Sequence, residues 1–290
     1  MRRRVIAALV TVTATAVAGL GASASQASVR LDGAGLRYVA MGDSYSAASG
    51  VLPPDPQADP RCLRSTSNFA HLIADKTGAT LTDVTCGGAQ TKDYFQAQYD
   101  GVPPQLEALR KNTQLVTMTI GGNDNNTFIG AIVSCGAAGL STAGQGSPCK
   151  DQYGSSFAHD IRTKTYPALV RTLKAVDRRA PHARVAILGY PWILPEEVGC
   201  FEKLPVAEGD VPYLHGIQAL LNREVHRAAD ETGSTYVNLS KVSQGHDACQ
   251  DIGVRWVEPV VTTTNPVVVH PNALGETEMA AQAMRVLDLG

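Results

Sequence analysis

The sequence lacks the features that mark several large classes of proteins. Aromatic residues make up 6% and charged residues 18% of the 290 residues, no charge run or Ser/Gly-rich linker divides the chain, and no internal repeat is visible. Hydrophobic residues at 44% are ordinary for a globular protein, which excludes a disordered chain, a collagen and a coiled coil. The formal net charge is −2, so no basic field neutralises a phosphate backbone and we expect no nucleic-acid partner.

Long apolar runs are missing everywhere except near the N-terminus. Three arginines after Met1 precede small and apolar residues 5–22, and Ser and Ala follow up to Ala27. This arrangement is typical of a secretory signal peptide, and a run rich in Ala and Thr disfavours a membrane anchor. Removal of residues 1–27 takes away three arginines and no acid, which leaves 22 basic against 27 acidic residues, a net charge of −5. We therefore predict a secreted, extracellular, soluble protein of residues 28–290.

Closely spaced cysteine pairs of the Cys-x-x-Cys type are absent, which disfavours a zinc site. Six cysteines all follow residue 27, and an even number in an oxidising compartment favours three disulfides. Fifteen connectivities are possible. Sequential pairing is the simplest, because each bridge then closes a loop of its own. The resulting pairs are Cys62–Cys86, Cys135–Cys149 and Cys200–Cys249.

Short apolar or β-branched runs alternate with amphipathic stretches of helical length, a pattern typical of β-α-β units and a parallel sheet. The expected strands are residues 36–41, 80–85, 115–120, 184–188 and 235–239. The expected helices are residues 67–77, 104–111, 152–179, 212–232 and 274–287. Two stretches outside the pattern, residues 51–60 and 136–147, are expected to be surface loops. Because nothing divides the chain, we predict one α/β domain over residues 28–290.

Three consecutive expected strands end in glycine-rich turns. The turns read Gly42-Asp43-Ser44, Cys86-Gly87-Gly88-Ala89 and Gly121-Gly122-Asn123-Asp124. Ligands and catalytic groups of open α/β sheets gather at the carboxyl ends of the strands. Glycines there let backbone N–H groups approach a substrate, and an Asn side chain adds an amide donor. A Gly-Asp-Ser turn taken alone favours a plain strand-to-helix connection, because these residues are the commonest turn formers.

One histidine follows an apolar run near the C-terminus, in the segment Val267-Val268-Val269-His270-Pro271-Asn272. A lone histidine is more often structural than catalytic, and Asn272 suits a helix cap. Only the combination of this segment with the three glycine-rich turns indicates a catalytic site.

In this order the four segments resemble the sequence blocks of the SGNH hydrolase superfamily, the GDSL-type lipases and esterases, and most closely the secreted three-disulfide lipases of actinobacteria. They span Gly42 to Asn272. The Gly-Gly-Asn-Asp and His-Pro-Asn blocks are fairly specific, whereas the second block is loose because Gly87 stands where Ser is common. The resemblance implies a flavodoxin-like three-layer α/β/α sandwich with a five-stranded parallel sheet, and an ester hydrolase that needs no metal or organic cofactor.

The resemblance also implies the roles of individual residues. Ser44 is the expected nucleophile and His270 the expected base. The backbone N–H groups of Ser44 and Gly88 and the side-chain amide of Asn123 are the expected oxyanion hole. Asp43 is interpreted as a turn residue, because neighbouring side chains in a strand point apart.

One position departs from the family pattern. Members often carry Asp three residues before the histidine, where this chain has Val267. Members of the secreted group let a main-chain carbonyl accept the Nδ1–H of the histidine instead, so the carbonyl of Val267 or Val268 is the expected orienting group. A distant acid, Asp247 or Asp251, is the alternative.

These observations favour a secreted lipase or carboxylesterase that acts on fatty-acyl esters, with phospholipase A activity or deacetylation of a carbohydrate as alternatives. A noncatalytic lipid- or glycan-binding relative is disfavoured, because a binding module has no need of Ser44, Gly88, Asn123 and His270 together. The expected partners are an acyl-ester substrate and a lipid surface, and the expected state is a monomer without a stable membrane anchor.

Overall fold

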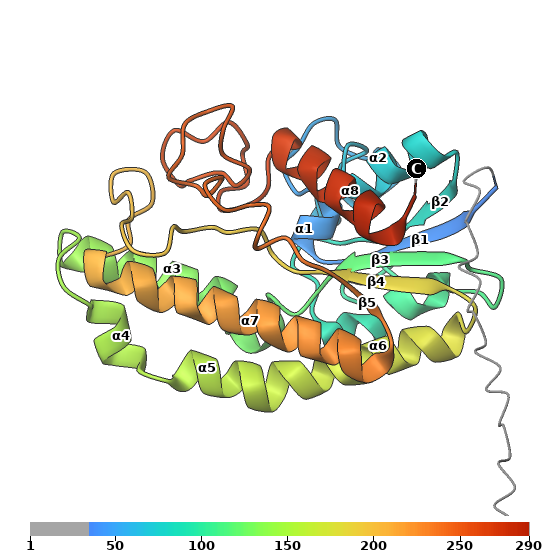
Figure 1. The fold of residues 1–290 in the computed structure, drawn as a ribbon, viewed down its shortest axis with the longest axis horizontal. Coiled ribbons are helices and arrows are strands. Elements are labelled where there is room, and N and C mark those ends of the chain that lie inside the picture. Colours follow the sequence, from blue (N-terminus) through green and yellow to red (C-terminus); the bar gives the residue numbers. More distant parts are fainter. Residues whose placement is uncertain (1–34, 290) are drawn as a thin grey trace, which may run out of the picture. The chain divides into compact units, whose positions relative to one another are not determined.

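The parallel sheet expected from the sequence is present in the computed structural model, which describes residues 35–289 (Figure 1). Its five strands lie in the order β2-β1-β3-β4-β5, and every neighbouring pair is parallel. The strands are β1 (Arg37–Gly42), β2 (Thr80–Asp83), β3 (Leu115–Thr119), β4 (Arg184–Leu188) and β5 (Thr235–Val237). All carboxyl ends therefore meet at one edge, and β1 lies inside the sheet. The expected signal peptide, residues 1–27, lies outside the described residues.

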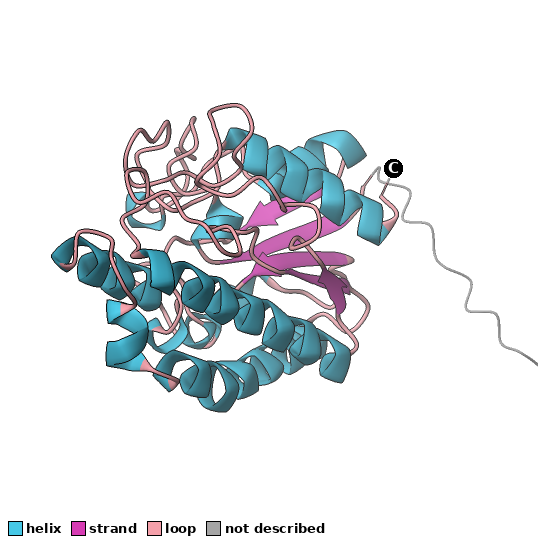
Figure 2. Cartoon of the chain, turned by 60° about the vertical axis from the view of Figure 1, so that its left-hand side comes forward, coloured by secondary structure: helices cyan, strands magenta, loops and turns pink. Residues whose placement is uncertain are grey.

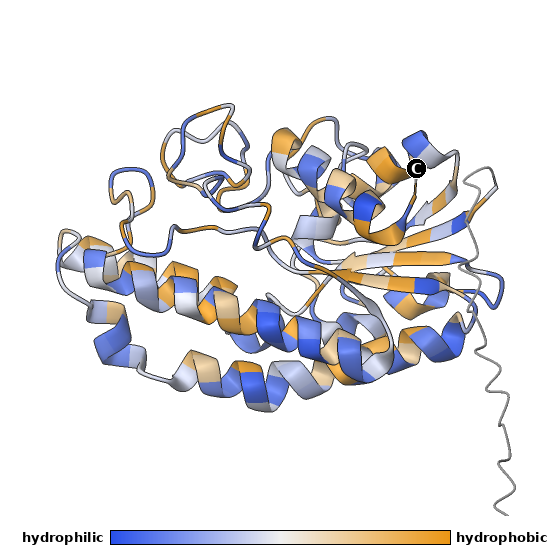
Figure 3. Ribbon diagram, viewed as in Figure 1, coloured by the Kyte–Doolittle hydropathy of each residue, from blue (hydrophilic) through white to orange (hydrophobic). Residues whose placement is uncertain are grey.

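Helices cover both faces of the sheet, as Figures 1 and 2 show. Helices α2 (Phe69–Thr77) and α8 (Ala273–Leu287) lie on one face, and α6 (Tyr166–Arg179) and α7 (Val211–Thr232) lie on the other. Alternate side chains of β1 belong to the two cores: Tyr38 and Ala40 pack on the α2/α8 side, and Val39 and Met41 pack on the α6/α7 side. The orange strands and the mixed orange and blue helices of Figure 3 reflect this sandwich. The fold is the predicted three-layer α/β/α arrangement.

The expected loop at residues 136–147 is wrong over its first half. Helix α3 (Ile129–Ser141) continues through residues 136–141 and is followed by α4 (Pro148–Tyr153). A Cβ atom on Gly139 would lie 2.5 Å from the carbonyl oxygen of Pro205. The glycines that favour a loop by propensity thus allow a close helix-to-backbone contact here, and tertiary packing outweighs propensity.

Two expected helices differ in extent. Residues 104–111 form only a 3₁₀ turn, Gln105–Ala108, whose Gln105 side chain bonds to the backbone N–H and carbonyl of Gly42 at 2.7 and 3.0 Å. Residues 152–179 are divided, because Gly154 has φ +52° and ends α4. Helix α5 (Ser156–Asp160) and a π-helical turn (Ile161–Thr165) then lead into α6. The expected loop at residues 51–60 contains no strand or α-helix.

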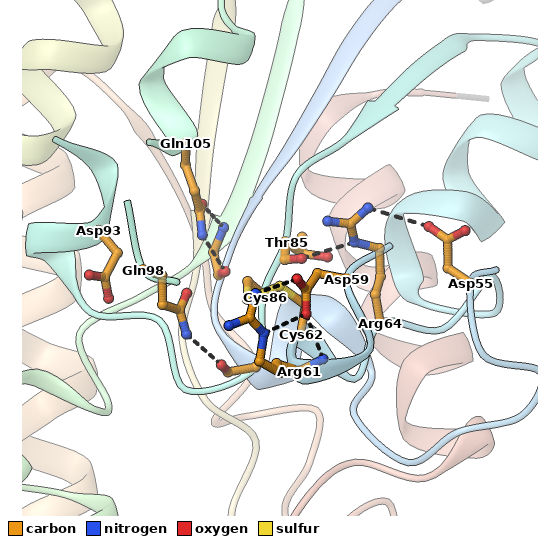
Figure 4. The surroundings of a disulfide bond; sticks show 12 residues. Asp55, Asp59, Arg61, Cys62, Arg64, Thr85, Cys86, Asp93, Gln98 and Gln105 are labelled. Carbon is orange, nitrogen blue, oxygen red and sulfur yellow. Dashed lines mark hydrogen bonds and ion pairs between the residues drawn. A yellow bond between two sulfur atoms is a disulfide. The ribbon is translucent and has the colours of Figure 1, made fainter. Parts of the chain in front are cut away.

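The cysteines pair sequentially, as expected: Cys62–Cys86, Cys135–Cys149 and Cys200–Cys249. The first bridge includes Cys86, the first residue of the second glycine-rich turn, and Figure 4 shows its surroundings. The second joins α3 to α4. Between residues 35 and 289, no helix is long and apolar enough to cross a bilayer.

Candidate active site

Ser44 lies where β1 turns into the short helix α1 (Ser44–Ala47). Gly42 has φ +119°, and a Cβ atom there would overlap the carbonyl oxygen of Thr119, so the turn requires glycine. Asp43 caps the helix by accepting the N–H of Tyr45 at 3.1 Å. The turn therefore places Ser44 as the first helical residue at the carboxyl edge of the sheet, with 6% of its surface exposed.

Ser44 and His270, 226 residues apart in the sequence, are in hydrogen-bond contact. The distance between Ser44 Oγ and His270 Nε2 is 2.7 Å, and that between His270 Nδ1 and the carbonyl oxygen of Val268 is 2.8 Å. Because a carbonyl oxygen only accepts, Nδ1 carries the proton, and Nε2 of the neutral ring accepts the Ser44 hydroxyl. Burial lowers the pKa of His270 below 6.5, and the bond to Val268 opposes this shift only in part.

The other expected orienting groups do not bond to the imidazole. Among residues 35–289 the Val267 carbonyl accepts no hydrogen bond, and the Val267 N–H donates to Asn265 Oδ1 at 3.0 Å. The carboxylate of Asp247 accepts the N–H of Cys249 at 2.9 Å. Asp251 lies 3.4 Å from Lys203 Nζ, with its side chain 93% exposed. Of the four groups considered in the sequence, the structure places the Val268 carbonyl against the imidazole.

Three donors expected for an oxyanion hole follow three neighbouring strands. Within residues 35–289, the N–H groups of Ser44 and Gly88 donate to no protein acceptor. Gly88 has φ +73° and is exposed. Asn123 Nδ2 donates to the carbonyl oxygen of Ala89 at 3.1 Å, which joins the third glycine-rich turn to the second. Because a carboxamide nitrogen carries two hydrogens, one remains for a ligand.

A buried network that sequence reasoning missed joins the serine turn to the asparagine turn. The Tyr190 hydroxyl donates to Asp43 Oδ2 at 2.5 Å and accepts the N–H of Gly122 at 2.8 Å. Thr119 Oγ1 donates to Asp43 Oδ1 at 2.7 Å. Burial raises the pKa of Asp43 to about 6, and the bonds from Tyr190 and Thr119 oppose the rise. Asp43 is thus a turn residue, as interpreted, with a wider bonding role. A single tyrosine beyond β4 carries no sequence signal for this contact.

The histidine segment has a left-handed residue that the sequence did not indicate. Val269 has φ +60°, which is unusual for a β-branched residue. Its N–H donates to the carbonyl oxygen of Glu258 at 3.0 Å, and its carbonyl accepts the Tyr45 hydroxyl at 2.8 Å. The N–H of Glu258 in turn donates to the carbonyl of His270 at 2.9 Å. These bonds hold the backbone that aims the Val268 carbonyl at the ring.

The Glu258 carboxylate is the buried centre of this segment. It accepts bonds from Arg255 Nη2 at 2.6 Å, Asn272 Nδ2 at 2.8 Å and the Thr264 N–H at 2.7 Å. The Arg255 and Glu258 side chains are 2% and 1% exposed. Burial raises the pKa of Glu258, but the bonds from Arg255, Asn272 and Thr264 outweigh it and bring the pKa to about 2. Asn272 also caps α8 through Gly275, so its cap role expected from the sequence is present.

The arrangement supplies a hydroxyl, a neutral imidazole and N–H donors at the carboxyl edge of the sheet, which suits nucleophilic acyl transfer. In the described part of the chain, no cluster of three or more His, Cys, Asp or Glu side chains could hold a metal ion.

Comparisons with known proteins identify a family whose model covers all four segments. The model of the GDSL-like lipase/acylhydrolase family matches residues 40–277. Lipase 2 of Streptomyces coelicolor is 58% identical over 289 residues, which are 99% of this chain and 98% of that protein. The crystal structures of phospholipase A1 from Streptomyces albidoflavus and of an extracellular lipase from Streptomyces rimosus have TM-scores of 0.71 at 26% and 27% identity. Each match covers 87% of this chain, with 97% and 98% of the respective crystal structures.

Proposed function

The chain belongs to the GDSL-like lipase/acylhydrolase family and is a carboxylic ester hydrolase, and we propose that it cleaves fatty-acyl esters through an acyl-enzyme formed on Ser44. The observation that carries the proposal is the 2.7 Å contact between Ser44 Oγ and His270 Nε2, with Nδ1 of the same ring on a carbonyl oxygen. Only in this tautomer is the lone pair of Nε2 directed at the hydroxyl that must lose its proton.

The reaction follows from this geometry. His270 Nε2 accepts the Ser44 proton as Oγ attacks the ester carbonyl carbon, and the imidazolium then gives that proton to the leaving alcohol. Water, deprotonated by the same ring, then attacks the acyl carbon, and the imidazolium returns the proton to Ser44 Oγ as the carboxylic acid is released. The Val268 carbonyl fixes the ring and its tautomer, and a dipole in place of a carboxylate stabilises the imidazolium less.

The oxyanion of each tetrahedral intermediate is bound by the Ser44 and Gly88 N–H groups and the second hydrogen of Asn123 Nδ2. Two observations support this assignment: the two backbone N–H groups are free of protein acceptors within residues 35–289, and Ala89 fixes the orientation of the Asn123 amide. Donors preset where negative charge develops contribute more to kcat than to ground-state binding.

A fatty-acyl substrate is supported by the lipases among the relatives, and the likeness to a phospholipase A1 favours phospholipids as a second substrate class. The predicted signal peptide over residues 1–27, the three disulfides and the likeness to an extracellular lipase support secretion of residues 28–290 as a single catalytic domain. We propose that this domain acts as a monomer at a lipid surface.

Ser44→Ala and His270→Ala test the mechanism. Each variant is expected to lower kcat by about 10⁶-fold on p-nitrophenyl esters, and the double variant is expected to be little worse, because nucleophile and base act as a unit. Ser156→Ala, at an exposed serine, is the control and is expected to keep the wild-type rate. Substantial hydrolysis by purified, folded Ser44→Ala contradicts the assignment.

The acyl series from acetate to palmitate, together with a phospholipid and an acetylated oligosaccharide, tests the substrate class. We expect kcat/KM to be highest for medium or long acyl esters. Highest activity on acetylated carbohydrate contradicts the fatty-acyl proposal and leaves the Ser44–His270 mechanism intact.

A further inference from the structure

The Gly88 N–H belongs to the peptide unit between Gly87 and Gly88. In a planar trans peptide the N–H and the C=O point in opposite directions. The carbonyl of this peptide accepts Gln98 Nε2 at 2.7 Å, and Figure 4 shows the Gln98 amide reaching the backbone beside the Cys62–Cys86 bridge. Gln98 therefore bonds to the carbonyl of the same peptide whose N–H, on the opposite side, is a proposed oxyanion donor.

The turn around this peptide is closed by the bond from the Ala89 N–H to the Cys86 carbonyl at 3.1 Å, and such a bond is compatible with either orientation of the central peptide. The N–H of Gly87 is bonded to the carbonyl of Cys62 at 2.7 Å, so the chain is anchored one peptide earlier. Between that anchor and Gly88 both residues are glycine, and Gly88 has φ +73°. Two adjacent glycines impose no steric barrier from a Cβ atom against rotation of the peptide between them. The Gln98 bond is the restraint that the structure shows on its carbonyl.

The Gln98 side chain is committed to this bond. Its Oε1 atom is buried without a partner among the described residues, although an unbonded buried oxygen is unfavourable. The opposite amide orientation would place two oxygens against each other, so Nε2 faces Gly87. Donation to the carbonyl also polarises the peptide and strengthens the N–H on its far side as a donor.

We infer that Gln98 is a positioning residue for the oxyanion hole, which aims and polarises the Gly88 N–H through the Gly87 carbonyl. This inference rests on the proposed function, since it assigns Gly88 to an oxyanion. It predicts an effect on the transition state, with substrate binding left nearly unchanged.

Two variants of Gln98 and one matched control test the inference. Gln98→Leu keeps the bulk and removes the donor, and Gln98→Glu places an acceptor against the Gly87 carbonyl. We expect Gln98→Leu to lower kcat by roughly 10-fold with KM within about twofold, a smaller loss than the 10²–10³-fold typical of removing an oxyanion donor, as in Asn123→Ala. Gln98→Glu is expected to lose at least as much. Gln96→Leu, at an exposed glutamine of the same segment, is expected to match wild type.

The measurement separates positioning from stability. Rates are divided by the concentration of Ser44 titrated with an activated phosphonate, so an unfolded fraction does not count. Inhibition by phenylboronic acid, whose adduct on Ser44 is tetrahedral, is expected to weaken by the same factor as kcat. A wild-type kcat per titrated site in Gln98→Leu, or a loss confined to KM or to the titrated fraction, overturns the inference. An active Ser44→Ala overturns the proposed function itself.

Discussion

At the scale of single residues, the proposed base, His270, has a neutral hydrogen-bond partner. The His270 Nδ1–H lies on the Val268 carbonyl, and burial lowers the pKa of the ring. A carboxylate at that position would instead favour the imidazolium and raise the pKa. The group that accepts the His270 Nδ1 hydrogen bond therefore helps to determine the pH range over which the imidazole is neutral and able to accept a proton.

The pH profile of kcat/KM tests this arrangement. Because the folded pKa lies below 6.5, neutral His270 persists as the pH falls through 6.5, and the acid limb is expected below that value. Asp247→Asn and Asp251→Asn are each expected to leave kcat and the limb nearly unchanged. An acid limb above 6.5, or a loss on the order of 10⁴-fold in either variant with the fold retained, indicates a triad acid instead.

At the scale of elements, the proposed base, His270, lies in neither a helix nor a strand. The segment before α8 is held by backbone bonds between Glu258 and the pair Val269 and His270, and by the Glu258 carboxylate on Arg255. This segment has no regular pattern of helix or strand hydrogen bonds, so its conformation depends on these individual contacts. The same contacts keep Val269 in its unfavourable left-handed conformation.

Glu258→Gln tests the strength of this support. The folded pKa of about 2 lies below the unfolded value of about 4.5, so the ionised carboxylate stabilises the fold above pH 4.5, and this contribution is lost as the pH falls toward 2. We expect Glu258→Gln to lower the free energy of unfolding by about 3 kcal/mol at pH 7, because Arg255 is left buried without its partner charge.

Urea unfolding at pH 7 and pH 3 measures the effect. More than half of the difference between Glu258→Gln and wild type is expected to disappear at pH 3, because wild-type Glu258 gains a proton on unfolding there. The exposed Glu202→Gln serves as control and is expected to change stability by less than about 0.5 kcal/mol. A difference that is the same at both pH values contradicts a charge-based role for Glu258.

At the scale of the whole molecule, the sheet supplies the frame and the disulfides restrain the long connections. The site groups follow β1, β2 and β3 and precede α8, so they meet at one edge although they span most of the chain. Each bridge restrains a connection outside the sheet, and the first lies directly before the Gly87–Gly88 peptide.

Thiol titration and paired Cys→Ala variants test the bridges. The denatured, unreduced protein is expected to show no free thiol, since every cysteine in the described chain is paired. In the loop-entropy model, separations of 14, 24 and 49 residues correspond to about 3, 3.5 and 4 kcal/mol. Removal of the Cys200–Cys249 pair is therefore expected to cost most in chemical unfolding. Two or more titratable thiols contradict the pairing.

Much of this protein could be predicted from local sequence patterns. The alternation of strands and helices predicted the sandwich, because burial on both sheet faces requires apolar strands and amphipathic helices. The three glycine-rich turns together with the His270 segment indicated Ser44 and Asn123 through the resemblance to the hydrolase family, because the chain turns sharply where a parallel strand ends at a site. Helix propensity failed at Gly139, where contact with a distant backbone decides the conformation.

The contacts that complete the site were decided by the tertiary structure alone. Choosing Val268 over Val267 depended on the left-handed turn at Val269, which is held by Tyr45 and Glu258 from distant parts of the chain. Local sequence specifies which groups follow each strand, because side-chain alternation and turn chemistry are short-range. It does not specify which nearby carbonyl meets the His270 ring, or that this ring meets Ser44 across 226 residues of sequence separation, because both contacts are the joint result of packing on both faces of the sheet.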